Sequence, residues 1–405
     1  MKTTRIPPFT AAVSSQYKRI ALVGTTALLT TLMLASCGSG SGGDIATAQV
    51  KTTTVGPIAG FGSVIINGVR YDDSSASVTT DNGTSLSRSE LRLGMMVELS
   101  GSSSSTTNTG SANTITVVSE IKGVVQSVSG DSIMVNGFVI TLTPTTVFDD
   151  LITPRVGDFV EIYGVFAATD NSVIATRIER KSPSDFKFRG TVSNWDATNA
   201  QFQLGSQLLN YSGTTLPTGF DNGVAVRAYA SAASNNGAWP VSGVRLVTRS
   251  RGDNGERAEI TGTIDSLIGT SDFSMNGLTV NAASARFDDG NATDLAIGRW
   301  VEVKGTFADG QLIATRVEFE DGDRSSSSDR SDSFEITGRI SNYTDLAEFS
   351  VRNTRIDASQ SPIFERGTAA NLGNGVCVEI KGNPISGPSG TVVLASEIKF
   401  DNDCS

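Results

Sequence analysis

Four glutamates recur at one place in a repeated pattern, and their type and spacing could support chemistry. Each follows a valine in the pattern Gly-x-x-Val-Glu; they are Glu98, Glu161, Glu302 and Glu379. Converging carboxylates can act as a general acid and base or bind a metal ion. A glycosidase, for example, needs two carboxyl groups about 5 to 9.5 Å apart. The chain contains no histidine, which excludes a Ser-His-Asp triad and His-ligated zinc.

The neighbouring charges favour a structural role for these glutamates. If each lies in a hairpin, the turn lengths place Glu161 opposite Arg177 and Glu302 opposite Arg316. Exposed cross-strand ion pairs of this kind contribute some tenths of a kcal/mol. The same arithmetic pairs like charges, namely Glu98 with Glu120, Glu379 with Glu397 and Arg227 with Arg245. Those side chains must be solvated or paired between repeats, and we predict no catalytic residue and no cofactor.

Three aspartate doublets are the next candidates, as calcium ligands from loops. They are Asp72-Asp73, Asp149-Asp150 and Asp288-Asp289. Calcium takes six to eight oxygen ligands, and nothing in the sequence reproduces an EF-hand loop with its bidentate Glu. We therefore interpret the doublets as surface turns and predict no metal site.

Composition narrows the class of protein. The 405 residues include 42 Gly and 11 Pro, which favours strands and turns over helices. The net charge is −10, and removal of Lys2, Arg5, Lys18 and Arg19 with the leader described next would leave about −14. Because Lys and Arg supply most of the affinity for phosphate backbones, nucleic acid is excluded as a partner.

The N-terminus has the organisation of an export signal. A basic segment ending in Lys18-Arg19 precedes an apolar stretch from Ile20 to Ala35, too short for a comfortable membrane span. The tetrad that ends in Cys37 resembles the lipobox of bacterial lipoproteins. That resemblance implies cleavage after residue 36, a lipidated Cys37, a flexible tether over residues 37–55 and an outer-membrane location, since Gly38 is not Asp. The alternatives are a plain secretory signal or a short uncleaved anchor.

The remaining cysteines fit an oxidising compartment. Without Cys37 the chain has two, Cys377 and Cys404. Disulfides persist in exported proteins, so we expect these two residues to be bonded. Two free thiols are the alternative.

Five copies of one pattern fill most of the chain. They span 56–122, 123–182, 187–250, 258–320 and 334–405, with a polar linker at 321–333. Asn-Gly pairs at Asn67, Asn136 and Asn276 are typical of two-residue hairpins. A unit of about 60 residues buries its edges best as a closed barrel. We predict an all-β tandem array of small OB-like antiparallel β-barrels.

Three apolar residues and one polar tract are expected at the barrel surfaces. Met96, Phe159 and Trp300 occupy equivalent outward positions and are candidates for contacts between barrels, with simple surface exposure as the alternative. The polar tract from Ser102 to Asn113 predicts a disordered hairpin loop.

The repeats resemble a bacterial family known only as domain of unknown function 5666. The resemblance runs from about Gly56 to Phe400 and rests on the Asn-Gly turn, the Gly-x-x-Val-Glu-x-x-Gly strand and the Ala-Thr-Arg-Ile/Val-Glu strand. It implies a small β-barrel in the cell envelope, with no known reaction or ligand. We expect a binding or scaffold protein rather than an enzyme, held to the membrane by lipid and contacting an envelope protein, peptide or glycan. The rival is a carboxylate-dependent, glycosidase-like envelope hydrolase.

Overall fold

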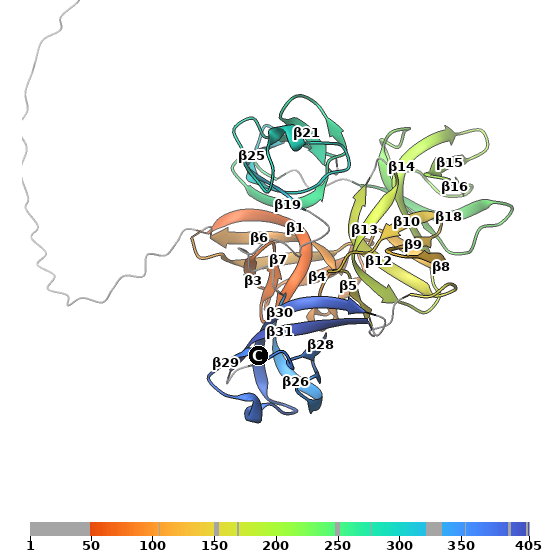
Figure 1. The fold of residues 1–405 in the computed structure, drawn as a ribbon. Helices are drawn as coiled ribbons and strands as arrows, with labels where there is room; N and C mark the ends of the chain where they lie inside the picture. Colours follow the sequence, from red (N-terminus) through yellow and green to blue (C-terminus); the bar gives the residue numbers. More distant parts are fainter. Residues whose placement is uncertain are drawn as a thin grey trace, which may run out of the picture. The chain divides into compact units, whose positions relative to one another are not determined.

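The computed structural model describes residues 49–104, 106–149, 154–167, 170–247, 252–275, 277–320, 334–352, 354–387, 390–401 and 404 (Figure 1). They belong to one compact unit, Thr47–Ser405. The predicted signal peptide, Cys37, Asp150, Asn276 and the predicted linker at 321–333 lie outside the described residues. No helix in these ranges is long and apolar enough to span a membrane.

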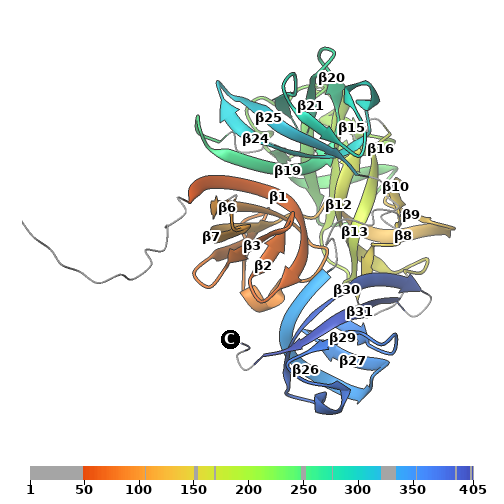
Figure 2. The same ribbon diagram turned by 60° about the vertical axis from the view of Figure 1, so that its left-hand side comes forward.

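The described residues form five small barrels, followed in Figure 2 by their strand labels. Barrel 1 contains β1 (Val50–Phe61), β2 (Val64–Ile66), β3 (Val69–Asp72), β4 (Ser77–Thr80), β5 (Ser85–Leu86), β6 (Met96–Ser104) and β7 (Thr109–Val117). Barrel 2 contains β8 (Ile121–Ser129), β9 (Ser132–Val135), β10 (Phe138–Thr141), β11 (Val147–Phe148), β12 (Phe159–Ala167) and β13 (Ser172–Arg180). Barrel 3 contains β14 (Phe186–Asp196), β15 (Gln201–Leu204), β16 (Gln207–Asn210), β17 (Ala225–Ala230) and β18 (Ala238–Leu246).

The last two barrels repeat this order. Barrel 4 contains β19 (Arg257–Thr263), β20 (Ser266–Leu267), β21 (Asp272–Met275), β22 (Leu278–Asn281), β23 (Arg286–Asp288), β24 (Trp300–Ala308) and β25 (Gln311–Phe319). Barrel 5 contains β26 (Phe334–Asp345), β27 (Glu348–Val351), β28 (Thr354–Asp357), β29 (Ile363–Glu365), β30 (Cys377–Gly387) and β31 (Gly390–Phe400). Short 3₁₀ turns at Arg88–Glu90, Ala292–Asp294 and Ala369–Asn371 precede the fourth main strand of barrels 1, 4 and 5.

The predicted all-β array of small barrels is confirmed, and the pairing shows how each unit closes. In barrel 1 the order is β1, β2, β3, β7, β6 and back to β1. The prediction of wholly antiparallel barrels is wrong in one respect, because β3 and the short strand β4 both run parallel to β7. A closed ring of five strands cannot alternate direction throughout, so at least one neighbouring pair must be parallel. The other barrels have the equivalent parallel pair.

Local sequence explains the hairpins. Asn67 and Gly68 have φ values of 51° and 74°, and Asn136 and Gly137 have 49° and 78°. Positive φ at both central residues is the signature of the type I′ turn that the Asn-Gly pairs predict. These turns join the second and third strands of barrels 1 and 2.

The last glycine of the Val-Glu-x-x-Gly motif lies at a β-bulge. The fourth and fifth strands change register between Lys304 and Gly305 in barrel 4, and between Tyr163 and Gly164 in barrel 2. An added Cβ at Gly305 would lie 2.3 Å from the carbonyl oxygen of Ile313. The motif therefore requires glycine because the two backbones approach too closely for a side chain.

The first strands of different barrels pair with one another. Residues Thr52–Val55 of β1 pair in parallel with Arg257–Ile260 of β19, and Gly60–Phe61 pair with Glu335–Ile336 of β26. Barrel 1 thus contacts barrels 4 and 5, which are far from it in the sequence. The first strand has backbone amides and carbonyls on one edge that its own barrel does not pair. A strand of another barrel pairs with them.

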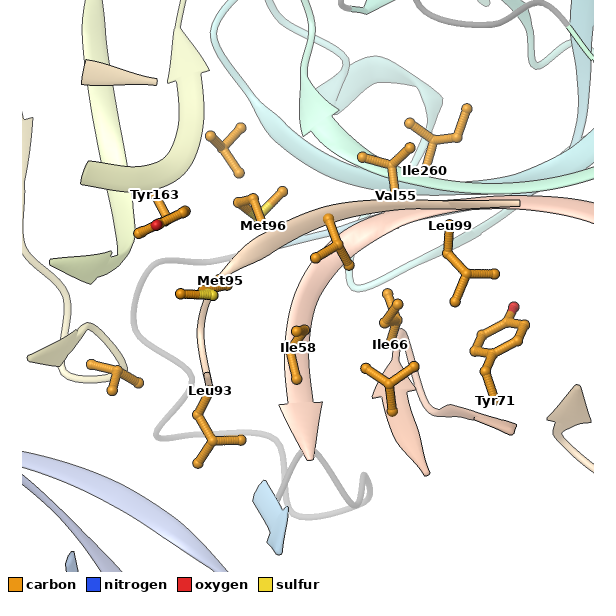
Figure 3. Close-up of a cluster of buried hydrophobic side chains, with 14 of the residues drawn as sticks. Val55, Ile58, Ile66, Tyr71, Leu93, Met95, Met96, Leu99, Tyr163 and Ile260 are labelled. Atoms are coloured by element: carbon orange, nitrogen blue, oxygen red, sulfur yellow. The ribbon is translucent and has the colours of Figure 1, made fainter. Parts of the chain in front are cut away.

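Alternating apolar residues fill the barrel interiors. In β24, Val301 and Val303 are fully buried while Glu302 between them points to the other face. Figure 3 shows interior residues of barrel 1, such as Ile58 and Leu99, with Val55 and Ile260 on the paired strands β1 and β19. Apolar contacts continue across barrels 1, 4 and 5, and a second apolar cluster joins barrels 2 and 3.

Two details differ from the sequence expectations. The tract from Ser102 to Asn113 is mostly strand, because β6 and β7 extend through it and the Oγ atoms of Ser102 and Ser111 lie 3.0 Å apart. Backbone pairing therefore outweighs the polar composition that predicted disorder. In addition, β1 begins at Val50, within the range expected for the tether.

Candidate functional site

The recurring glutamates lie on the fourth main strand of their barrels, but their predicted partners are wrong. Glu161 is opposite Glu179 rather than Arg177, and Glu302 is opposite Glu318 rather than Arg316. The bulge glycine adds one residue to the register, which the turn-length arithmetic could not include. Glu98 is opposite Thr116 and Glu379 is opposite Lys399, so these two expected like-charge pairs are also wrong. The expected Arg227–Arg245 pair is confirmed.

Lysines compensate the carboxylates that face each other. Lys181 lies 2.5 Å from Glu179 and 3.8 Å from Glu161. Lys304 lies 3.1 Å from Glu302, and Lys399 lies 2.8 Å from Glu379. The side chains of Glu161, Glu302 and Glu379 are only 12 to 18% exposed, so the prediction of exposed pairs is wrong as well. These glutamates therefore have a structural role, in ion pairs within their own barrels.

Each aspartate doublet has an arginine partner, and in barrel 1 this is Arg88, 3.7 Å from Asp73. Arg177 Nη2 lies 2.9 Å from Asp149 Oδ1, and Arg316 Nε donates to Asp288 in the equivalent place. An ion pair therefore links the Phe-Asp-Asp motif to the Ala-Thr-Arg strand within one repeat. In barrel 1, Asp72 Oδ1 accepts a hydrogen bond from the backbone of Ser74, a common turn contact. Among the described residues, no three Asp, Glu or Cys side chains converge as metal ligands would.

A polar cavity of about 390 Å³ lies where barrels 1, 2 and 3 meet, and we name it the three-barrel cavity. The residues that matter for its chemistry are Asp81, Ser119, Lys122, Glu161, Lys187 and Tyr229. Asp81 lies in the turn after β4, Lys122 and Glu161 are on β8 and β12, and Lys187 and Tyr229 are on β14 and β17. No single repeat could form this cavity.

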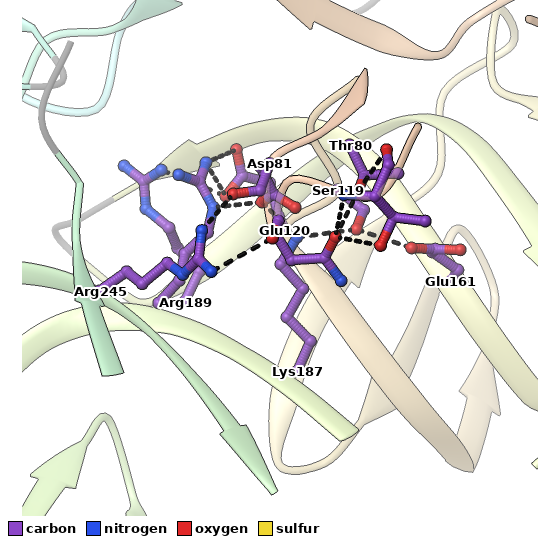
Figure 4. Close-up of polar contacts among 11 residues, drawn as sticks. Thr80, Asp81, Ser119, Glu120, Glu161, Lys187, Arg189 and Arg245 are labelled. Atoms are coloured by element: carbon purple, nitrogen blue, oxygen red, sulfur yellow. Dashed lines mark hydrogen bonds and ion pairs between the residues drawn. The ribbon is translucent and has the colours of Figure 1, made fainter. Parts of the chain in front are cut away.

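One wall of the cavity is a chain of hydrogen bonds across the three barrels (Figure 4). Lys187 Nζ donates to Asp81 Oδ2 at 2.5 Å and to Ser119 Oγ at 3.0 Å. Ser119 Oγ in turn donates to Glu161 Oε1 at 2.8 Å. The Lys187 side chain is only 5% exposed, and this burial lowers its pKa although Asp81 acts in the opposite direction.

Arginines complete the network behind this wall. Arg227 lies 3.2 Å from Asp81 and 3.3 Å from Glu120, and Arg189 lies 3.2 Å from Glu120. Arg245 donates to the backbone carbonyl oxygens of Asp81 and of the next residue, at 3.1 and 3.2 Å. Buried ion pairs of this kind hold a specific arrangement because a charge left without its partner is costly.

Sequence reasoning expected Glu120 and Arg227 to be solvated or paired between repeats, and these two residues do pair with each other. It missed the rest of this network. Its members are contributed by three barrels, and Lys187 and Asp81 are 106 positions apart. A signal was present: Lys187 and Arg189 alternate with Phe186 and Phe188 on β14, which places two cations on one strand face. In the structure Lys187 and Arg189 are both buried, so the face that carries them must meet anions.

A second pair of carboxylates lies in barrel 4. Lys304 Nζ lies 2.5 Å from Glu259 Oε1 and 3.1 Å from Glu302 Oε1. Burial and, next, the charge of Glu302 raise the pKa of Glu259 to about 8. Glu259 therefore holds a proton at neutral pH, as a general acid would, but neither carboxylate lines the three-barrel cavity.

The outward apolar residues and the cysteines are placed as follows. Met96, Phe159 and Trp300 are all at most 5% exposed, which rules out the alternative of surface exposure. Phe159 packs edge-on against Phe186 of barrel 3, with ring centroids 5.4 Å apart, and so forms a contact between barrels. The predicted Cys377–Cys404 disulfide is present, with the two Cα atoms 5.7 Å apart. Cys37 lies outside the described residues.

Comparison with known proteins agrees with the repeats. The family described as Domain of unknown function (DUF5666) matches residues 122–179, 261–318 and 337–399. A search of curated proteins finds no significant match. The matched segments coincide with barrels 2, 4 and 5, and barrels 1 and 3 have the same strand pairing without a match. Barrels 2, 4 and 5 are thus tandem domains of the DUF5666 family.

Proposed function

We propose that this chain is a lipid-anchored protein of the bacterial cell envelope that acts as a binding or scaffold module without catalytic chemistry. The anchor rests on the sequence alone, where Cys37 follows an apolar stretch of signal-peptide length. Five copies of one closed unit suit a scaffold, because repetition adds contact surface, whereas an active site generally requires one distinct cluster of residues. The partner would be an envelope protein, a peptide or a glycan.

The observation that carries the binding proposal is the three-barrel cavity. Its volume of about 390 Å³ lies in the range of small-molecule sites. The Tyr229 hydroxyl is buried without a hydrogen-bond partner, and the Lys122 ammonium has no partner among the residues that the structure describes. Both residues line the cavity, and the Lys122 ammonium would gain a partner from a polar ligand.

The alternative function is a carboxylate-dependent, glycosidase-like hydrolase, and the Glu259–Glu302 pair is the observation that favours it. A protonated acid beside a second carboxylate is the arrangement such chemistry uses. Lys304, however, contacts both side chains and neutralises the charge of Glu302. For this reason we keep the non-catalytic function as the main proposal.

Membrane fractionation tests the anchor. In cells that make the full chain, wild-type protein should sediment with membranes and Cys37→Ala protein should be soluble. Ser39→Ala serves as the matched control because it changes the adjacent tether without removing the thiol. Membrane retention of the Cys37→Ala chain would contradict the lipid anchor.

Capture from envelope extracts tests the binding proposal. Wild-type chain should retain a peptide, protein or glycan that a Lys122→Ala, Tyr229→Phe double variant loses. Equal capture by both chains would refute the cavity as the site. Release of reducing sugars from envelope glycans by the wild type, but not by Glu302→Gln, would instead establish the hydrolase.

A further inference from the structure

The contact between barrels 1 and 2 is built from a turn and a strand segment. The turn, residues 92–95, precedes β6, and the segment, residues 174–177, lies on β13. Thr176 Oγ1 donates to the carbonyl oxygen of Gly94 at 2.7 Å, and Arg177 Nη1 donates to that of Leu93 at 3.2 Å. We call residues 92–95 the docking turn and residues 174–177 the receptor segment.

This contact is close and specific. Leu93 is 2% exposed, and an added Cβ at Gly94 would lie 2.5 Å from the Thr176 carbonyl oxygen. The orientation of the Arg177 guanidinium is fixed, because its Nε donates to Glu179 and its Nη2 donates to Asp149. Only Nη1 is left to reach the docking turn.

Barrel 4 carries an uncovered copy of the receptor segment at residues 313–316 of β25. Strand pairing makes Arg316 the equivalent of Arg177, since each is paired with the strand that bears the Phe-Asp motif. Arg316 contacts the equivalent acids through Nε, to Asp288, and through Nη2, to Glu318 at 3.2 Å. Its Nη1 has no partner among the described residues, and its side chain is 29% exposed against 5% for Arg177.

The rest of this second receptor segment is also unoccupied. Ile313 is 37% exposed, whereas its counterpart Ile174 packs into the apolar cluster of barrels 1, 4 and 5. Thr315 is exposed, and its hydroxyl donates to the carbonyl oxygen of Lys304 in its own barrel at 3.1 Å. In the occupied copy the equivalent hydroxyl donates to the docking turn.

Barrel 2 carries an uncovered copy of the docking turn at residues 155–158. Arg155-Val156-Gly157 matches Arg92-Leu93-Gly94 in residue type, and both turns close with the same backbone hydrogen bonds. The glycines have φ values of 76° at Gly94 and 93° at Gly157. Val156 is 66% exposed, and an added Cβ at Gly157 would meet nothing within 4 Å.

We propose that the docking turn of barrel 2 binds the receptor segment of barrel 4 in a second copy of this chain. The occupied contact within the chain supports this partner, because it joins the same two kinds of surface through the Thr176–Gly94 and Arg177–Leu93 hydrogen bonds. The two surfaces differ, so the contact is head-to-tail and propagates from copy to copy unless it closes into a ring.

Cross-linking tests the geometry. A mixture of full chains carrying Val156→Cys and Thr315→Cys should form covalent dimers with a short bismaleimide, and one chain with both changes should form a ladder. Wild-type chain gives the background. A mixture of Val156→Cys and Ile363→Cys chains is the matched control, because Ile363 in barrel 5 is 67% exposed but lies on no receptor segment. Equal dimer yields in the two mixtures would overturn the proposal.

Sedimentation of the full chain tests the energetics. Wild-type protein should shift to larger species over a hundredfold rise in concentration, and Val156→Asp should weaken this association at least tenfold. Val139→Asp is the control, since it places the same charge at a 43% exposed valine of the same barrel and should leave association unchanged. A wild-type chain that stays monomeric, or equal effects of the two substitutions, would refute the contact.

Discussion

Lys187 on β14 contacts Asp81, 106 positions earlier in the chain, with Nζ and Oδ2 2.5 Å apart. This contact joins barrel 3 to barrel 1, and Ser119 and Glu161 extend it to barrel 2. The three barrels are therefore fixed to one another by buried charges as well as by apolar packing. The same residues line one wall of the three-barrel cavity.

Replacing Lys187 by Met should destabilise the folded chain by about 3 kcal/mol, because Asp81 then keeps a buried charge with one partner fewer. Urea denaturation followed by tryptophan fluorescence measures the effect. Arg180→Met is the control, since the Arg180–Asp158 pair involves an arginine side chain that is 44% exposed. That change should cost at most about 1 kcal/mol. Equal costs for the two variants would contradict a structural role for the network.

Gly305→Ala should destabilise barrel 4 by roughly 1 to 3 kcal/mol, because the added Cβ would lie 2.3 Å from a backbone oxygen of the neighbouring strand. Gly373→Ala, where an added Cβ meets nothing within 4 Å, should change stability by about 0.5 kcal/mol or less. Thermal unfolding of both variants checks the bulge. A tolerated alanine at Gly305 would show that the motif glycine has another purpose.

Glu259 makes stability depend on pH in a defined window. The folded chain keeps the Glu259 proton up to a pKa of about 8, whereas the unfolded chain loses it near the ordinary pKa of 4.5. The stabilisation is complete below pH 4.5 and falls as pH rises to 8, by at most about 1.4 kcal/mol per pH unit.

Substitution isolates this effect. Glu259→Gln cannot ionise, so wild type should lose stability relative to this variant between pH 4.5 and 8, as urea titrations at several pH values would show. Glu348→Gln, at a side chain that is 57% exposed, serves as the control. A difference that stays constant with pH would disprove the raised pKa.

Removal of the disulfide should lower the free energy of unfolding of barrel 5. Cys377 and Cys404 are 27 positions apart, and closing a loop of this size stabilises by about 3.5 kcal/mol in the chain-entropy model. A Cys377→Ala, Cys404→Ala double variant should therefore unfold at lower denaturant concentration than wild type. Reduction of the wild-type chain should reproduce the shift, and the variant should no longer respond to a reductant. A variant as stable as the oxidised protein would contradict this role.

Local pattern was sufficient to predict much of the fold. Asn67-Gly68 and Asn136-Gly137 form the turns that their sequence indicates, and the Cys377–Cys404 bond joins the two cysteines left after Cys37. Each of these features depends on neighbouring residues or on a count. Repetition then extends one recognised unit to the others.

Partners between strands and between barrels could not be predicted in the same way. The bulge at Gly164 shifts the register, so Arg177 lies opposite Tyr163 instead of Glu161. Nothing in the sequence alone shows that Lys187 meets Asp81 of another barrel. Alternation indicated which residues point outward, but the docking of one barrel on another decides what those residues contact.

The pairing of β1 with β19 has a consequence for biogenesis. Translation proceeds from the N-terminus, so barrel 1 can close before residues 257–260 exist. Until then the edge of β1 at Thr52–Val55 offers unpaired amides and carbonyls to any strand nearby. The nascent protein therefore passes through a stage in which this edge can pair with other strands, and pairing with β19 ends that stage.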